Sequence, residues 1–239
     1  MIEPLLLAVV RVSTFVGGFA LTAATGFFFE RADRLFLVTG RHVFADEPSG
    51  HHPDRLELRL HTDAVDLTRT AVLSLPLYRN GMSLWRQARD SGGEVDVGVL
   101  ELDRATLPLG TVLRSFTPAH LQDELEAIGL GAPLLIVGYP LGFFDTVHNL
   151  AVAREAVVAS AFGVRFQGQG YFLTDARMHR GASGAPVALR DPDGDPALPW
   201  KLLGIHSARL DMRTREQGVD DTLGLNCAWY ADILRTLTA

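Results

Sequence analysis

A serine stands between two glycines in residues 174–186, which read TDARMHRGASGAP. Glycine has no Cβ and tolerates backbone conformations that other residues avoid, so main-chain N–H groups beside Ser183 can turn toward one point. Such groups stabilise the negative charge that develops on a carbonyl oxygen under attack. The segment therefore predicts a nucleophilic Ser183, with an oxyanion hole formed by the N–H groups of Gly181 and Ser183.

Two upstream segments carry the other residue types that a nucleophilic serine needs. Residues 39–43, TGRHV, place His42 at the end of an apolar strand, and residues 95–100, VDVGVL, place Asp96 inside another. An imidazole within hydrogen-bond distance can remove the hydroxyl proton of Ser183. A carboxylate on the other imidazole nitrogen fixes the tautomer and stabilises the imidazolium. We therefore predict His42 as the base and Asp96 as its partner.

The flanking sequence and the chain order both favour Asp96 over other acids. Asp96 lies between two valines, where a buried carboxylate needs a partner. Asp90 and Asp103 fit less well, because they lie in loops or at a strand end. The order His, Asp, Ser is one of the known orders of a catalytic triad. An α/β-hydrolase is excluded, because its histidine follows the serine and its serine sits on a strand–turn–helix elbow.

Short apolar or alternating segments bounded by Gly, Pro, Asp and Asn dominate the chain, and this pattern is typical of β-strands. About a dozen strands are expected, in two groups that suit a double barrel. The first group begins with a strand over residues 9–16, and the second with a strand over residues 133–138. Between the groups, residues 118–129 predict a short linker helix with Gly129 as its C-cap. Apolar residues at helical spacing predict a closing helix within residues 228–237.

At these motifs the sequence resembles the trypsin/chymotrypsin superfamily of serine peptidases, and especially the disulfide-free bacterial trypsin-like domains such as those of HtrA/Deg proteases. Residues 25–29, TGFFF, are similar to the strand before the family histidine, and residues 138–142, GYPLG, to a second-barrel motif. Ala182 replaces the aspartate that locks digestive enzymes in their active form, so no switch of that type is expected. We expect no PDZ module after the domain.

The resemblance implies an all-β fold of two six-stranded antiparallel Greek-key barrels with a C-terminal helix. Residues 1–117 would form the first barrel, which carries His42 and Asp96. Residues 118–239 would add the linker helix, the second barrel with Ser183 and the closing helix. Together the two barrels would make one peptidase domain with a serine endopeptidase activity.

The resemblance also indicates which residues contact the substrate. The strand that contains His206 and Ser207 would form one wall of the pocket for the residue that precedes the cleaved bond. Arg177 lies six residues before Ser183, where the family has the pocket floor. An imidazole and a guanidinium there would accept Glu, or else Gln or Asp. The alternative is that Arg177 points to solvent and His206 is structural. Ser207 is either a hydrogen-bond partner of Asp96 or an ordinary strand serine.

Composition and net charge limit the classes of binding partner and the cellular compartment that we expect for this protein. The net charge of −6 and the absence of lysine or arginine blocks argue against a nucleic-acid surface. The apolar run at residues 5–10 is too short to span a bilayer, and Glu3 replaces the basic region of a signal peptide. With Cys227 as its one cysteine, the chain forms no internal disulfide. We therefore expect a cytoplasmic protein that acts on protein or peptide substrates, without a membrane partner, metal or cofactor.

Two alternatives to a constitutive peptidase remain open. One is a binding or scaffold module that keeps the fold without turnover, although a decayed enzyme usually loses one triad residue. The other is a peptidase that stays latent until an activating protein partner orders its loops. The glycine-rich segments 91–93 and 166–170 are the candidate mobile loops.

Overall fold

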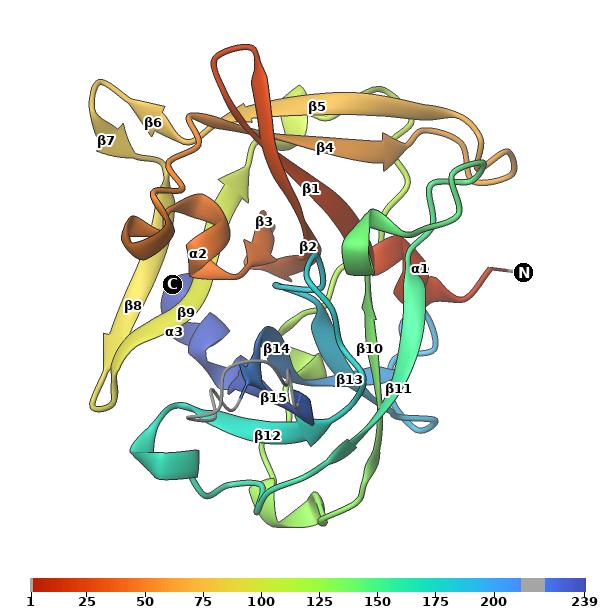
Figure 1. Cartoon of the computed structure of the whole chain (residues 1–239). Helices are drawn as coiled ribbons and strands as arrows, with labels where there is room; N and C mark the ends of the chain where they lie inside the picture. The colour runs from red at the N-terminus through yellow and green to blue at the C-terminus, as the bar shows by residue number, and fades with distance from the viewer. Residues whose placement is uncertain (1, 212–221) are drawn as a thin grey trace.

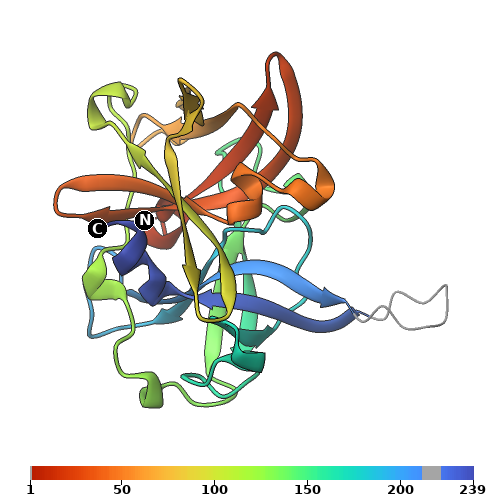
Figure 2. The ribbon, with the colours of Figure 1, turned by 90° about the vertical axis from the view of Figure 1, so that its left-hand side faces the viewer.

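The computed structural model describes residues 2–211 and 222–239, with side chains described over 2–208 and 224–239. The chain folds into two β-structured halves that lie one above the other in Figure 1, with the first half coloured red to yellow and the second green to blue. Figure 2 shows the same division from the side. The all-β class predicted from the sequence is confirmed.

Within the described residues, the first half is a sheet of seven antiparallel strands in the order β5-β4-β1-β2-β3-β9-β8. A separate two-stranded sheet of β6 and β7 falls between β5 and β8 in the sequence. The strands are β1 (Val9–Val16), β2 (Phe19–Arg31), β3 (Arg34–Thr39), β4 (Arg55–His61), β5 (Thr70–Pro76), β6 (Tyr78–Arg79), β7 (Met82–Ser83), β8 (Trp85–Asp90) and β9 (Gly93–Leu102).

Alternating side chains explain why β4 forms a strand with one buried face. Leu56, Leu58 and Leu60 are buried, whereas the charged residues between them are not. Strand β8 was not predicted, because its sequence, WRQARD, has no apolar repeat. It forms because the next segment, β9, is strongly apolar and folds back on it as a hairpin partner.

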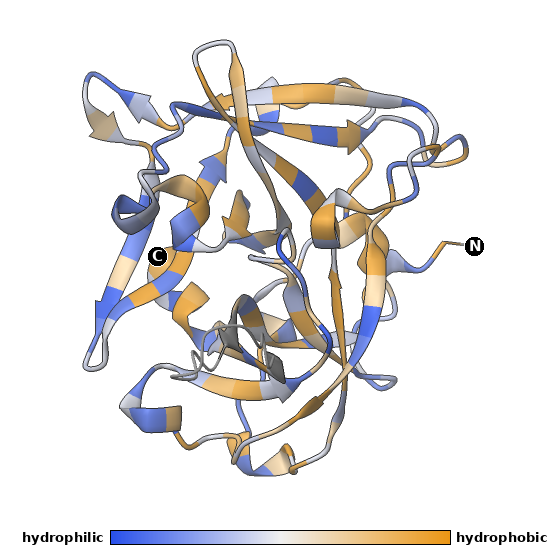
Figure 3. Ribbon diagram, viewed as in Figure 1, coloured by the Kyte–Doolittle hydropathy of each residue, from blue (hydrophilic) through white to orange (hydrophobic). Residues whose placement is uncertain are grey.

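The second half is a closed barrel, which among the described residues has six strands in the order β10-β11-β12-β15-β14-β13. Figure 3 shows β10 as largely hydrophobic, as expected of a strand that faces a core. The strands are β10 (Pro133–Gly138), β11 (Val152–Val158), β12 (Tyr171–Asp175), β13 (Pro186–Arg190), β14 (Trp200–Asp211) and β15 (Thr222–Tyr230).

The helical elements are short. The linker helix predicted over residues 118–129 is instead two 3₁₀ turns, Pro118–His120 and Leu125–Ala127. The chain between them is extended because Leu121 is buried and forms a β-bridge with Leu202 of the second barrel. The closing helix exists in shorter form, since residues 228–230 belong to β15. The helices are α1 (Pro4–Ala8), α2 (Arg41–Phe44) and α3 (Leu234–Leu237).

One hydrophobic cluster crosses the seam between the halves and holds them together. It joins Phe27 and Val38 of the first sheet to Val137 and Trp229 of the barrel, and to Leu234 of α3. Each such side chain contributes about 1.5–3 kcal/mol when fully buried. Within the described part of the chain, no helix combines the length and apolar character needed to cross a membrane.

Candidate active site

His42 lies in α2, directly after the end of β3. Gly40 is the N-cap residue of this short helix, in an extended conformation. A Cβ on Gly40 would lie 2.8 Å from Cε1 of the His42 ring, so the imidazole packs directly over the glycine backbone. The TGRHV motif therefore ends a strand, turns once and presents the imidazole at the edge of the first sheet.

Asp96 lies in β9 and binds His42 through both carboxylate oxygens. Oδ2 is 2.7 Å from His42 Nδ1, and Oδ1 accepts the backbone N–H of His42 at 2.9 Å. The flanking Val95 and Val97 are buried in the seam cluster, at 1% and 0% exposure. Their burial fixes the strand and aims the intervening carboxylate at the histidine.

Ser207 of β14 provides a third hydrogen bond to the carboxylate. Its hydroxyl donates to Asp96 Oδ2 at 2.5 Å, across the seam between the two halves. Of the two interpretations made from sequence, the structure therefore has Ser207 as a partner of Asp96. The carboxylate accepts from both halves of the molecule, so its position depends on how they are docked.

Neighbouring groups shift the pKa values of both triad partners. Burial alone would lower the pKa of His42, but the hydrogen bond and charge of Asp96 outweigh it and hold that pKa above its ordinary value. Burial would likewise raise the pKa of Asp96, but His42 and Ser207 hold it below the ordinary range. Asp96 is therefore ionised at neutral pH, and its charge stabilises a protonated His42.

Ser183 stands in a tight loop between β12 and β13. Gly181 and Gly184 both have positive φ, at 91° and 85°, which side-chain-bearing residues rarely adopt. The Ser183 hydroxyl donates to the backbone carbonyl of Ser207 at 3.2 Å. Ser183 and His42 line the same cleft, and among the described residues no hydrogen bond joins the Ser183 hydroxyl to the imidazole.

The backbone beside Ser183 leaves two donors free. In the described residues, the N–H groups of Gly181 and Ser183 have no hydrogen-bond acceptor. The carbonyl before Gly181, that of Arg180, accepts the N–H of Leu141 at 2.6 Å. In a planar trans peptide the N–H points opposite to the carbonyl, so this bond turns the Gly181 N–H away from Leu141. Both free donors lie in the loop that carries the Ser183 hydroxyl, where an oxyanion hole needs them.

The cleft that contains His42 and Ser183 has a volume of about 520 Å³. One wall is the segment 20–24 of β2, and the other carries Asp46 and His51 from the loop after α2. The charge of Asp46 also contributes to raising the pKa of His42.

Arg177 and His206, predicted to bind the substrate side chain, lie in different environments. Arg177 is exposed, whereas His206 is buried at 2% exposure and its Nδ1 has no hydrogen-bond partner among the described residues. Burial, with a smaller effect of the His42 charge, lowers the pKa of His206 to about 4, so it is neutral at pH 7. The backbone of His206 pairs with Gly184 and Ala185, beside the nucleophile loop. No hydrogen bond or ion pair joins the described side chains of Arg177 and His206.

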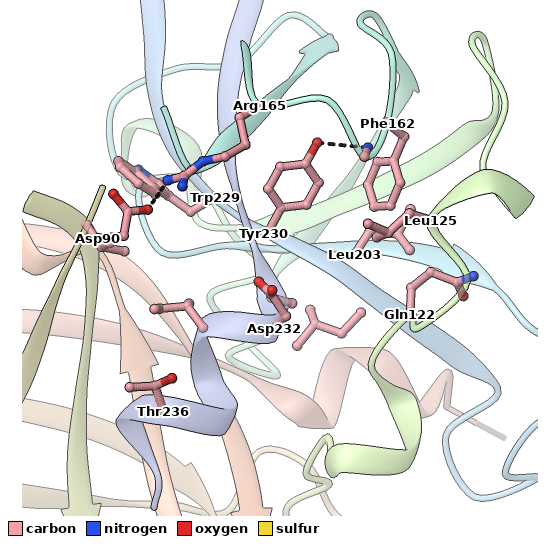
Figure 4. Close-up of a pocket in the computed structure, with 16 residues that line it drawn as sticks. Asp90, Gln122, Leu125, Phe162, Arg165, Leu203, Trp229, Tyr230, Asp232 and Thr236 are labelled. Atoms are coloured by element: carbon pink, nitrogen blue, oxygen red, sulfur yellow. Dashed lines mark hydrogen bonds and ion pairs between the residues drawn. The ribbon is translucent and has the colours of Figure 1, made fainter. Parts of the chain in front are cut away.

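The two glycine-rich loops predicted to be mobile pack against each other. Arg165 forms an ion pair with Asp90 and donates to Ser91 Oγ at 2.8 Å. A Cβ on Gly92 would lie 2.9 Å from the carbonyl oxygen of Gly168, so the glycines allow this close approach. The pair lies at one end of a second cavity of about 320 Å³, which contains neither His42 nor Ser183 (Figure 4).

Thr25 contacts the nucleophile loop, although its sequence motif did not predict a role for it in the site. It directly precedes Gly26 in the TGFFF motif, and its hydroxyl donates to the Gly181 carbonyl at 2.7 Å. Position next to a motif glycine was the one available signal. Among the described residues, no cluster of three or more His, Cys, Asp or Glu side chains is arranged to hold a metal.

The chain belongs to the trypsin-like peptidase domain family, whose model matches residues 24–195, more than half of the chain. Among solved structures it is similar to the HtrA-type protease AlgW with a tripeptide (TM-score 0.59, 17% identity), covering 98% of this chain and 59% of that one. It is also similar to the serine endoprotease from Yersinia pestis (TM-score 0.57, 15% identity), covering 98% of this chain and 62% of that one.

At these identities the two structures share the fold with this chain, and the chain spans about three-fifths of their length. No curated protein sequence matches it. Family membership and fold together define a trypsin-like peptidase domain, and one of its clefts is lined by His42 and Ser183.

Proposed function

We propose that this domain is a serine endopeptidase that hydrolyses peptide bonds in protein or peptide substrates through an acyl-enzyme. The observation that carries the proposal is the arrangement at one cleft of three elements: the His42–Asp96 pair, the Ser183 hydroxyl and two unpaired backbone N–H groups beside it. The family match and the HtrA-type structures support the same reaction class.

The reaction follows from the roles of these groups. His42 accepts the proton of Ser183 as the hydroxyl oxygen attacks the substrate carbonyl, and Asp96 stabilises the resulting imidazolium. The N–H groups of Gly181 and Ser183 hold the oxyanion of the tetrahedral intermediate. His42 then gives its proton to the leaving amine. His42 then takes a proton from a water molecule as the water oxygen attacks the acyl carbon. It returns that proton to the Ser183 oxygen as the bond between them breaks, which releases the acid and regenerates the Ser183 hydroxyl.

Hydrolysis of fluorescein-labelled casein tests the proposal. Wild-type protein should release labelled peptides, and Ser183→Ala should reduce the rate by several orders of magnitude, leaving about 10³–10⁴-fold catalysis over water. Ser13→Ala is the matched control, because Ser13 lies on β1 outside the cleft lining. Equal rates for wild type and Ser183→Ala would exclude this serine as nucleophile.

We further propose a preference for Glu or Gln before the cleaved bond. The Nδ1 of His206, beside the nucleophile loop, is buried and has no partner among the described residues, so a substrate side-chain oxygen that reaches it would meet a hydrogen-bond donor. Because His206 is neutral at pH 7, it offers a hydrogen bond, and a positive charge for Glu must come from Arg177. A peptide library that shows turnover after Lys, Arg or Leu and none after Glu or Gln would overturn this preference.

A peptidase that is latent until a partner acts is the second candidate. The hydrogen bond of the Ser183 hydroxyl to the Ser207 carbonyl favours it, because the hydroxyl proton is then donated to a carbonyl and not to the imidazole of His42. A silent binding module is the third outcome. Reaction of the isolated protein with a fluorophosphonate distinguishes them: rapid reaction indicates an active enzyme, reaction only after addition of cell extract indicates latency, and none indicates a silent module.

A further inference from the structure

Thr25 lies in β2, fully buried at 0% exposure, where the first sheet meets the nucleophile loop. Its hydroxyl donates to the carbonyl of Gly181 at 2.7 Å and accepts the backbone N–H of Tyr139 at 3.0 Å. Its own backbone N–H donates to the carbonyl of Ser183 at 3.0 Å. One residue of the first half therefore binds three backbone groups of the second half.

Glycines of the nucleophile and GYPLG motifs lie where the chain passes Thr25. A Cβ on Gly138 would come within 2.6 Å of the Thr25 hydroxyl oxygen, and a Cβ on Gly184 within 2.2 Å of the Thr25 carbonyl oxygen. Thr39 of β3 completes the packing, because its hydroxyl donates to the Thr25 carbonyl at 2.7 Å. A side chain at either position would collide with Thr25, so the close approach of both motifs to Thr25 requires glycine at Gly138 and Gly184.

The bonds of Thr25 restrict the peptide planes on which the oxyanion hole depends. Its hydroxyl fixes the carbonyl of Gly181, and its N–H fixes the carbonyl of Ser183. Peptide groups are planar, so fixing the planes on both sides limits the orientation of the Ser183 N–H between them.

The same hydroxyl also acts indirectly on the second oxyanion-hole donor, the N–H of Gly181. By accepting from Tyr139 N–H, it holds the turn whose Leu141 N–H binds the Arg180 carbonyl. That bond sets the direction of the Gly181 N–H. Leu141 keeps its N–H in this position with a positive φ of 54°, a conformation that needs support from the surrounding structure.

We propose that Thr25 is a positioning residue whose hydroxyl holds both oxyanion-hole donors in place from the opposite half of the molecule. The inference rests on the proposed peptidase function. The role needs a short side chain that can both donate and accept a hydrogen bond, because the Thr25 hydroxyl oxygen donates to the Gly181 carbonyl and accepts from the Tyr139 N–H. Valine has the same shape and neither function, whereas serine keeps both.

Inactivation by a fluorophosphonate, with the maximal rate (kinact) and the half-saturating concentration (KI) measured separately, tests the proposal. The phosphonyl oxygen of the adduct occupies the oxyanion hole, so misplaced donors slow bond formation more than binding. For Thr25→Val we expect kinact to fall at least about tenfold and KI to change less than about threefold. Thr25→Ser should restore kinact to within about threefold of wild type.

Thr238→Val is the matched control, since Thr238 is buried and its hydroxyl donates to Leu234 O at 2.6 Å, away from the cleft. If Thr25→Val is as stable as this control and keeps the wild-type kinact, the positioning role is wrong. If Thr25→Val does not fold, Thr25→Ala replaces it with the same expectation. A wild-type protein that stays unreactive even after addition of cell extract would refute the peptidase proposal itself, whereas a reactive wild type with unaffected Thr25 variants refutes only this inference.

Discussion

Replacing Asp96 by asparagine is the sharpest perturbation of the proposed triad. The carboxylate accepts three hydrogen bonds, two from His42 at 2.7 and 2.9 Å and one from Ser207 at 2.5 Å. An asparagine side chain of the same shape has one oxygen and one NH₂ group. In either orientation the NH₂ faces a group that donates in the wild type, so at least one contact becomes donor against donor.

The magnitude follows from the tautomer of His42. If the asparagine NH₂ faces Nδ1, the ring accepts there and carries its proton on Nε2, where it cannot take the proton of Ser183. If the amide is reversed, the NH₂ meets the His42 backbone N–H and the imidazolium loses its counter-charge. A comparable change in a serine peptidase triad lowers kcat about 10⁴-fold. At about 1.4 kcal/mol per factor of ten, this is roughly 5 kcal/mol of barrier.

Steady-state hydrolysis of a peptide substrate at pH 7, with circular dichroism to verify folding, measures this effect. The matched control is Asp103→Asn, because Asp103 is exposed and, within the described part of the chain, its carboxylate accepts only the local N–H of Ala105. The control should keep wild-type kcat. A folded Asp96→Asn variant with kcat within about tenfold of wild type would refute the assigned role of the carboxylate.

Three further predictions concern the same site. Because the pKa of His42 is raised and catalysis needs the neutral imidazole, kcat/KM should rise with pH and reach half of its maximum above pH 6.5. In Asp96→Asn, any residual activity should reach its half-maximum at a lower pH than in the wild type. A wild-type half-maximum below pH 6.5 would contradict the expectation. Ser207→Ala removes one donor to a charged group and should lower kcat about tenfold, measured against the same peptide; an unchanged kcat would show that this hydrogen bond does not support catalysis. Arg177→Gln should reduce cleavage after Glu but not after Gln in a peptide pair, and an equal loss for both would remove its charge-selective role.

Local pattern was sufficient to predict most of the β-structure and to select the triad candidates. The strand bounds at residues 9–16 and 133–138 match the prediction, because strong apolar runs end at clear turn residues. Strand β8 was missed because its side chains are polar and its pairing comes from β9. The linker helix was wrong because burial of Leu121 against Leu202 outweighs the helical pattern.

The site shows a similar division between local and long-range information. Residue types and order were enough to place His42 beside Asp96, since both lie in motifs with one plausible chemical partner. The contacts of Thr25 could not be predicted, because they join positions 114 and 156 residues apart in the chain. The burial of His206 depends on packing between strands and loops, which hydrophobic periodicity does not encode.

The central claim is that Ser183 is a nucleophile activated by His42. Its most direct test is to treat the folded protein with a fluorophosphonate and to map the adduct by peptide mass spectrometry. We predict a single adduct on Ser183 in the wild type, and a rate of adduct formation reduced by several orders of magnitude in His42→Ala. A folded wild type that gives no adduct even with cell extract, or an adduct on another serine, would contradict the claim.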